Sequence, residues 1–204
     1  IAAEKDYLNS LELIIQHNSS LLTTQDENGW MPIMWILKNG NGRLISLIAV
    51  SYPNLLLVRD KDGYTPVSKA AEKNFLNSLE LIIQHNSSLL TIEDEIGWMP
   101  IMWILNNGNG RLISLILEKN PDILLVRNKD GYTSVWVAAS NHFTTALELI
   151  INQNPTFLTT EDDIGWMPII WILEKGNERL INLILEKNPD LLQVENKIGR
   201  QPIS

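Results

Sequence analysis

Two kinds of apolar run alternate along the chain, and together they predict pairs of helices. The longer kind, as from Leu112 to Ile116, places apolar side chains on one face of a helix with about 3.6 residues per turn. The shorter kind, from Pro32 to Lys38, is almost wholly apolar and begins with proline, which suits the first position of a helix. Gly40 follows and predicts a left-handed residue that ends this helix. The corresponding positions further along hold Asn74, Gly108, His142 and Gly176.

The chain should change direction after each longer helix. In one repeat this helix should end near Asn120, because Pro121 forbids its continuation. We expect an extended stretch from Ile123 to Val126 to lead into the next turn.

One 34-residue unit recurs through the sequence. Its marker is a glycine at a constant interval of 34 residues, namely Gly29, Gly63, Gly97, Gly131, Gly165 and Gly199. Glycine suits a turn with positive φ, and self-similarity at such a period is typical of stacked repeats. Both ends of the chain fall inside a unit, so we expect the array to continue in a longer protein. The predicted organisation is a partial repeat 1–25, repeats 26–59, 60–93, 94–127, 128–161 and 162–195, and a partial repeat 196–204.

A second period of 68 residues shows that two repeat types alternate. The segment from Asn9 to Thr23 returns unchanged as Asn77 to Thr91. Type B reads Gly-Trp-Met-Pro-Ile, as at Gly29, and type A reads Gly-Tyr-Thr-Pro-Val, as at Gly63.

Type A carries a resemblance to a known family. The stretch from Asp60 to Val67, followed by Ala70-Ala71, resembles the ankyrin signature Asp-x-x-Gly-x-Thr-Pro-Leu with its later pair of small residues. The resemblance implies an all-α fold, a solenoid of helical hairpins with short fingers between repeats. Type B departs from the signature, since Met31 replaces the threonine and Ile36-Leu37 replace the alanines.

The tetratricopeptide repeat is the rival fold, because its period is also about 34 residues. It places its proline at the end of the second helix and lacks a glycine turn before a first helix that starts with proline. Under either name each unit buries its apolar face against its neighbours.

The charge balance bears on the partner. The 16 Lys and Arg against 24 Asp and Glu give a formal charge of −8, which disfavours nucleic acid because phosphates need clustered basic residues. No run approaches the roughly 20 apolar residues of a membrane span, and no secretory signal is visible. The absence of cysteine excludes disulfides and fits a reducing environment, cytoplasmic or host-cytosolic.

No pattern of catalytic, metal-binding or cofactor-binding residues emerges, so we expect neither an enzyme nor a cofactor. His17 and His85 are copies of each other near helix ends, where the helix dipole favours histidine. Neither has a second histidine at the spacing of a helical metal site. Phosphate-cradling glycine motifs and the serine hydrolase motif are also missing.

The resemblance implies that fingers and first helices line a concave binding face. The residue after each glycine should lie on it, and this ladder reads Trp30, Tyr64, Trp98, Tyr132 and Trp166, then Arg200. Trp, Tyr and Arg are enriched at binding hot spots. The alternative role for these rings is packing over neighbouring turns. We interpret Trp35, Trp103 and Trp171 as core packing between repeats, and Trp136 as filling space.

Acidic residues gather in the type B fingers, where Glu95 and Asp163 are candidate partner contacts. We therefore expect a monomeric protein-binding scaffold whose partner is another protein with a basic or apolar surface, guided by complementary charge. A solvated edge that keeps the array soluble is the alternative interpretation of these charges. A second hypothesis for function is an array that targets or positions substrate for a larger enzyme or a secreted bacterial effector, with the catalytic part outside this segment. A structural spacer is the third.

Overall fold

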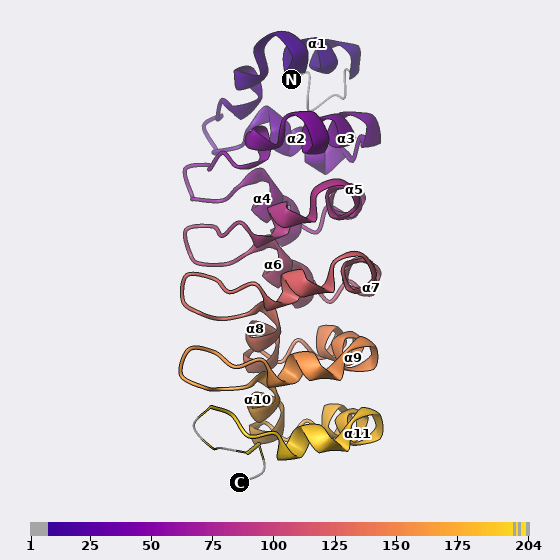
Figure 1. The fold of residues 1–204 in the computed structure, drawn as a ribbon. Helices are drawn as coiled ribbons and strands as arrows, with labels where there is room; N and C mark the ends of the chain where they lie inside the picture. Colours follow the sequence, from indigo (N-terminus) through magenta and orange to yellow (C-terminus); the bar gives the residue numbers. More distant parts are fainter. Residues whose placement is uncertain (1–7, 198, 200, 203–204) are drawn as a thin grey trace. The chain divides into compact units, whose positions relative to one another are not determined.

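The structure is a computed structural model that describes residues 8–197, 199 and 201–202. It divides into two compact units, residues 1–103 and residues 104–204, and each is described by itself. In both units the described chain consists of helices joined by turns (Figure 1). Among the described residues, β-pairing is confined to one isolated antiparallel bridge between Arg127 and Thr133. The expected all-α fold is confirmed.

Unit 1 contains two layers of helices. The longer helices α1, α3 and α5 pack one against the next, and the short helix α2 packs against α4. Each longer helix is followed by a single 3-10 turn. The bounds are α1 Leu8–Asn18, η1 Ser19–Thr23, α2 Pro32–Asn39, α3 Gly42–Ser51, η2 Pro53–Leu56, α4 Pro66–Glu72, α5 Leu76–Asn86 and η3 Ser87–Thr91, and α6 Pro100–Asn107 begins here.

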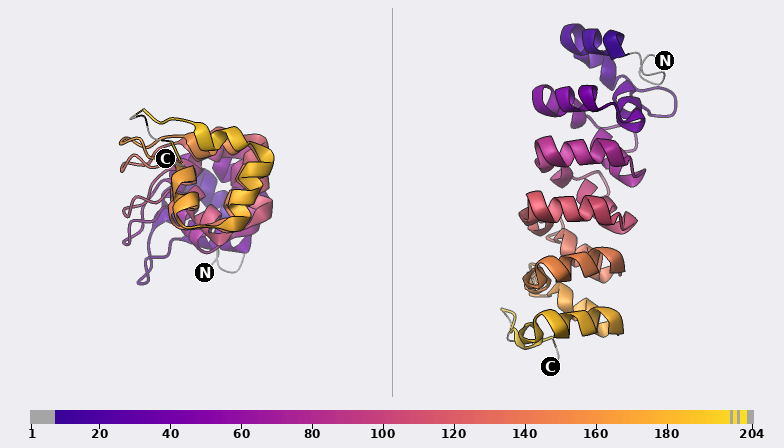
Figure 2. Two further views of the ribbon diagram at one scale, coloured as in Figure 1. Left: turned by 90° about the horizontal axis from the view of Figure 1, so that it is seen from below. Right: turned by 90° about the vertical axis from the view of Figure 1, so that its right-hand side faces the viewer.

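Unit 2 repeats this plan. The longer helices α7, α9 and α11 pack in sequence, and the short helix α8 packs against α10. Figure 2 shows the longer helices of unit 2 in its right-hand view, coloured from red to yellow. The bounds are α7 Gly110–Lys119, η4 Pro121–Leu125, α8 Ser134–Ser140, α9 Thr144–Gln153, η5 Pro155–Thr159, α10 Pro168–Glu174, α11 Glu178–Lys187 and η6 Pro189–Gln193.

The core of each unit comes from the apolar faces that the sequence predicts. In α7, Leu112, Ile113 and Ile116 are buried, and Leu115 is half-buried at the edge of the same face. The short helices are buried on more sides because each lies between its own longer helix and the next repeat. This explains why α2 is apolar almost throughout, with Ile33, Met34, Ile36 and Leu37 all buried.

Helix ends follow the expected residues. Gly40 has φ +70° and its N–H bonds the last carbonyls of α2, and Asn74 and His142 adopt the same left-handed backbone at φ +58° and +61°. In the type B repeats the next helix then begins at an asparagine cap, as where the Asn109 side chain accepts a hydrogen bond from the Leu112 N–H at 3.2 Å. Such a cap satisfies one of the unpaired donors in the first turn of a helix.

The expected extended stretch from Ile123 to Val126 is wrong. Asn120 leaves the helix at φ −156° and ψ 71°, and residues Pro121–Leu125 form a 3-10 turn. Pro121 ends α7 as expected, but its fixed φ equally suits the first position of a new turn. The turn buries Ile123 and Leu124. None of the described helices is both long enough and apolar enough to cross a membrane.

Candidate partner-binding face

Each finger is closed at its base by a side chain of aspartate or asparagine. The Oδ1 atom of Asp60 accepts hydrogen bonds from the N–H groups of Asp62 at 3.0 Å and Tyr64 at 2.8 Å. The Asp60 N–H in turn donates to the Tyr64 carbonyl at 2.9 Å. The N–H of the residue four positions later donates an equivalent bond to Oδ1 of Asp26, Asp94, Asn128 and Asp162. This finger clamp therefore fixes the backbone of the five aromatic ladder residues in the same way.

The clamp residues hold the fingers in shape. From the sequence they were interpreted only as part of the acidic charge, so this role was missed. Asp60, Asp94 and Asp162 are buried, with 7%, 3% and 4% of their surface exposed. They are therefore unavailable to a partner. The signal in the sequence was the constant spacing of three residues between this Asp or Asn and the turn glycine.

In unit 1 the ladder rings are half-buried and lie against the short helices that follow them. The Trp30 and Trp35 rings lie 4.9 Å apart between centroids, and Lys38 Nζ lies 4.5 Å from the centroid of Trp35. Over Tyr64 the cation is Lys69, whose Nζ lies 3.9 Å from the ring centroid. Such cation–π contacts place an ammonium group over the electron-rich face of a ring.

The Trp98 ring also lies in unit 1, and it packs against another indole. Its centroid is 4.5 Å from that of Trp103. Trp103 Nε1 donates to Asp94 Oδ2 at 3.3 Å, so the clamp residue of this finger also orients the second ring.

In unit 2 the rings form one continuous cluster. Tyr132 stacks on Trp136 at 4.1 Å between centroids, and Trp136 meets Trp171 edge to face at 5.6 Å. Trp166 lies 5.8 Å from Trp171. All four residues are half-buried, so the cluster retains an exposed part.

The interpretation of Trp35, Trp103 and Trp171 as core packing between repeats needs correction in part, although Trp171 does pack against Trp136 of the preceding repeat. All three are half-buried, and each contacts a ladder ring of its own repeat. They sit one turn into the short helix, which places them beside the finger base and not between layers. Trp136 does fill space, since it covers Tyr132, but it also extends the aromatic cluster. Arg200, the sixth ladder position, lies outside the described residues.

Glu95 and Asp163 lie at exposed finger tips, where the structure also gives them a packing role. The side chain of Glu95 covers Gly63 of the preceding finger so closely that a Cβ built there would lie 2.5 Å from Glu95 Cβ. Asp163 covers Gly131 in the same way and pairs with Arg127 at 3.4 Å, while 77% of its side chain stays exposed. Lys61 and Lys197 take the corresponding place over Gly29 and Gly165.

Arginines tie each type A finger to the next finger. Arg59 Nη1 donates to the Gly63 carbonyl at 2.8 Å, and its Nη2 donates to the Glu93 carbonyl. Arg127 repeats both bonds, to Gly131 and Glu161. These guanidinium groups therefore join successive fingers through backbone carbonyls.

Two neighbouring ionisable groups, the Tyr64 phenol and the Glu72 carboxylate, have shifted pKa values. Burial, and after it the carboxylates of Glu72 and Asp94, raise the pKa of the Tyr64 phenol. Burial alone would raise the pKa of Glu72, but hydrogen bonds from Lys73 and Lys69 outweigh it and hold that pKa below its usual value. Tyr64 is therefore neutral and Glu72 charged at neutral pH.

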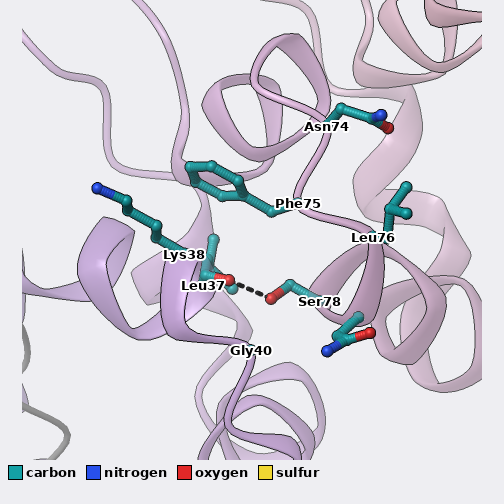
Figure 3. A pocket seen from close by; sticks show the side chains of 8 residues that line it. Leu37, Lys38, Gly40, Asn74, Phe75, Leu76 and Ser78 are labelled. Carbon is teal, nitrogen blue, oxygen red and sulfur yellow. Dashed lines mark hydrogen bonds between the residues drawn. The ribbon is translucent and has the colours of Figure 1, made fainter.

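Other candidate chemistry is not assembled in the part of the chain that the structure describes. The exposed His17 ring hydrogen-bonds the Leu13 carbonyl, and the exposed His85 ring contacts Ser46. No group of three or more His, Asp or Glu suited to a metal ion occurs among the described residues. A cavity of about 330 Å³ lies in unit 1 where α2 ends and α5 begins, lined by residues such as Phe75 and Ser78 (Figure 3). One of its polar groups, Ser78 Oγ, donates to the Leu37 carbonyl and so helps α5 to pack against α2.

Comparison with known proteins gives a family match for part of the chain. The family described as ankyrin repeats in three copies matches residues 1–93. No curated protein sequence matches the chain. The fold is similar to that of the ankyrin repeat domain of Bcl-3, a member of the IkappaB family, with a TM-score of 0.74 and 16% identity over 98% of this chain and 90% of that one.

Bacterial structures are similar as well. An ankyrin repeat domain from Acinetobacter baumannii has a TM-score of 0.64 at 15% identity, covering 91% of this chain and 95% of that one. A chain from the complex of a predatory endopeptidase of Bdellovibrio bacteriovorus with an immunity protein has a TM-score of 0.59 at 22% identity, covering 92% and 96%. Residues 1–93 therefore match ankyrin repeats by sequence, and the fold of the chain is similar to that of ankyrin repeat domains.

Proposed function

We propose that the chain is a binding scaffold that recognises another protein through the concave face formed by its finger bases and short helices. Ankyrin repeats are in general protein–protein interaction modules. The observation that carries the proposal is the ladder, in which one clamp geometry holds a half-exposed aromatic ring at the same place in successive fingers. Structural packing alone does not require an aromatic residue at each of these positions, since the clamp bonds only the backbone.

The partner we propose presents basic and apolar groups. The ladder contributes Trp30, Tyr64 and Trp98 in unit 1, and Tyr132 and Trp166 in unit 2. Acidic tips flank the rings, with Glu95 in unit 1 and Asp163 in unit 2. Apolar tips follow directly, since Ile96 and Ile164 are 59% and 68% exposed. Exposed apolar side chains rimmed by charge are typical of interaction surfaces.

The proposal is tested by affinity capture with matched variants. Trp98→Ala, Tyr132→Ala and Trp166→Ala together should abolish capture of proteins that the wild-type chain retains. Val50→Ala with Leu185→Ala is the control, because both side chains are exposed on longer helices, 63% and 45%. Capture by the ladder variant equal to that by wild type would contradict the proposal.

A second variant avoids removing packing area. Glu95→Lys with Asp163→Lys reverses the charge of two tips, and the fold accommodates lysine there because Lys61 and Lys197 already cover the equivalent glycines. Because the partner is proposed to be basic, we expect slower association and weaker capture by this variant, most clearly at low salt. Unchanged capture at low salt would argue against a basic partner.

A further inference from the structure

Equivalent aromatic rings have charged neighbours of opposite sign in the two units. In unit 1, Lys38 stands three residues after Trp35 in α2, and its ammonium group lies over the Trp35 ring at 4.5 Å and near that of Trp30 at 5.9 Å. In α10 of unit 2, four repeats further on, the residue three after Trp171 is Glu174. Residues three apart on a helix lie on the same face. The position that holds a cation in unit 1 therefore holds a carboxylate in unit 2.

The rings of unit 2 keep an exposed carbon surface. Trp136 and Trp171 are half-buried, and the Nε1 atom of each is buried and has no acceptor among the described residues. The part of each indole that meets solvent is therefore carbon, and ring carbon faces are the surfaces that attract cations. No Lys or Arg of the described chain lies over either ring. Lys175, which follows Glu174, is exposed.

We propose that Trp136, Trp171 and Glu174 form a receptor for an arginine side chain of the partner protein. This inference rests on the proposed protein-binding function and names the chemistry of one contact. A guanidinium group is planar, stacks on aromatic faces and pairs with a carboxylate through two N–H groups. The two indoles provide the face and Glu174 the carboxylate. Lysine fits less well because its compact ammonium is more strongly hydrated.

The test is a titration of the full chain with N-acetyl-arginine methylamide, followed by the indole N–H resonances in ¹⁵N NMR spectra. Trp136→Phe and Trp171→Phe assign the two resonances. We expect saturable shifts at both, with a dissociation constant on the order of 10 mM, because a single exposed cation–π contact is weak. The lysine analogue should bind several-fold more weakly, and the glutamine analogue should give no saturable shift. Equal binding of the lysine or glutamine analogue would overturn the proposal.

Two surface substitutions exchange the charges of the equivalent positions in the two units. Glu174→Lys recreates the Lys38 arrangement and should reduce binding of the arginine probe at least about tenfold, since the chain's own cation then covers Trp171. Lys38→Glu should create a second arginine site, seen as new shifts of the Trp35 indole. Both positions are exposed, so neither change removes core packing. Probe binding that is unaltered in Glu174→Lys would refute the site.

The outcome is separable from that of the proposed function. The capture experiment measures binding by the whole ladder face, whereas the titration measures one site without the partner. If the arginine probe fails to bind while capture still depends on the ladder, the arginine receptor alone is refuted.

Discussion

The side chain of Asp60 accepts a hydrogen bond from the Tyr64 N–H at 2.8 Å, while the Tyr64 carbonyl accepts one from the Asp60 N–H at 2.9 Å. Asp60→Ala should lower the free energy of unfolding by about 1–3 kcal/mol, because buried N–H groups lose their acceptor. Asp60→Asn should cost much less, since Asn128 forms the same bonds in its finger, at 2.9 Å to the Tyr132 N–H. Urea denaturation followed by circular dichroism measures both. An asparagine variant as unstable as the alanine variant would show that charge, not hydrogen bonding, holds the finger.

Gly63 has both a positive φ and a close neighbour over its Cα. Gly176 has only the positive φ, so comparing the two glycines separates the two effects. Gly63 has φ +81° and Glu95 directly over it, whereas Gly176 has φ +66° and nothing within 4 Å of a built Cβ. Gly176→Ala should therefore cost only backbone strain, on the order of 1 kcal/mol. Gly63→Ala should cost clearly more, because the finger must also move away from Glu95. Equal losses in thermal unfolding would mean that the close approach of Glu95 is relieved at no cost.

Stability should depend on pH through Glu72. Its pKa in the folded chain lies, despite burial, below the usual value of a glutamate because Lys73 and Lys69 bond its carboxylate, so the native state favours the ionised form. This contribution is present above about pH 4.5 and is lost as the pH falls through the folded-state pKa. Glu72→Gln should therefore be less stable than wild type at pH 7, and the difference should shrink toward pH 3. A difference that stays constant over this range would remove Glu72 from the acid response.

Ser78 and Ser10 offer a test within identical sequence. Ser78 is buried and donates to the Leu37 carbonyl, whereas Ser10 occupies the same place in the copied segment and is exposed (Figure 3). Ser78→Ala should lower the free energy of unfolding by roughly 1 kcal/mol. Ser10→Ala should change it by no more than about 0.5 kcal/mol, as is usual at the surface. Equal effects in urea denaturation would contradict the hydrogen-bonded role of Ser78.

Features set by local backbone chemistry could be predicted from the sequence. Gly40, Asn74 and His142 were expected to be left-handed and are, because few residues tolerate that backbone. The helix pairs could also be predicted, because the spacing of apolar residues reflects the period of a helix. The 3-10 turn after Asn120 was not foreseen, because proline ends one helix and starts a turn equally well.

Features set by contacts between repeats could not be predicted in the same way. In the sequence, Asp94 is one of three consecutive acidic residues. Only the folded finger shows that its carboxylate is buried and hydrogen-bonded to Trp98 and Trp103. Trp35 and Lys38 are likewise unrelated in the sequence until the helix brings them together over one ring. The structure places the aromatic ladder rings against the short helices, and their use by a partner stays a prediction.

The duplicated segment has a consequence for assembly at high concentration. Asn9 to Thr23 and Asn77 to Thr91 are identical, and α3 packs against both helices that contain them. A place left open when one copy is released can therefore be filled by a segment of identical sequence from a second molecule. Such exchange is a characteristic failure of repeat proteins, and it makes interlocked dimers the misassembled species to expect during refolding.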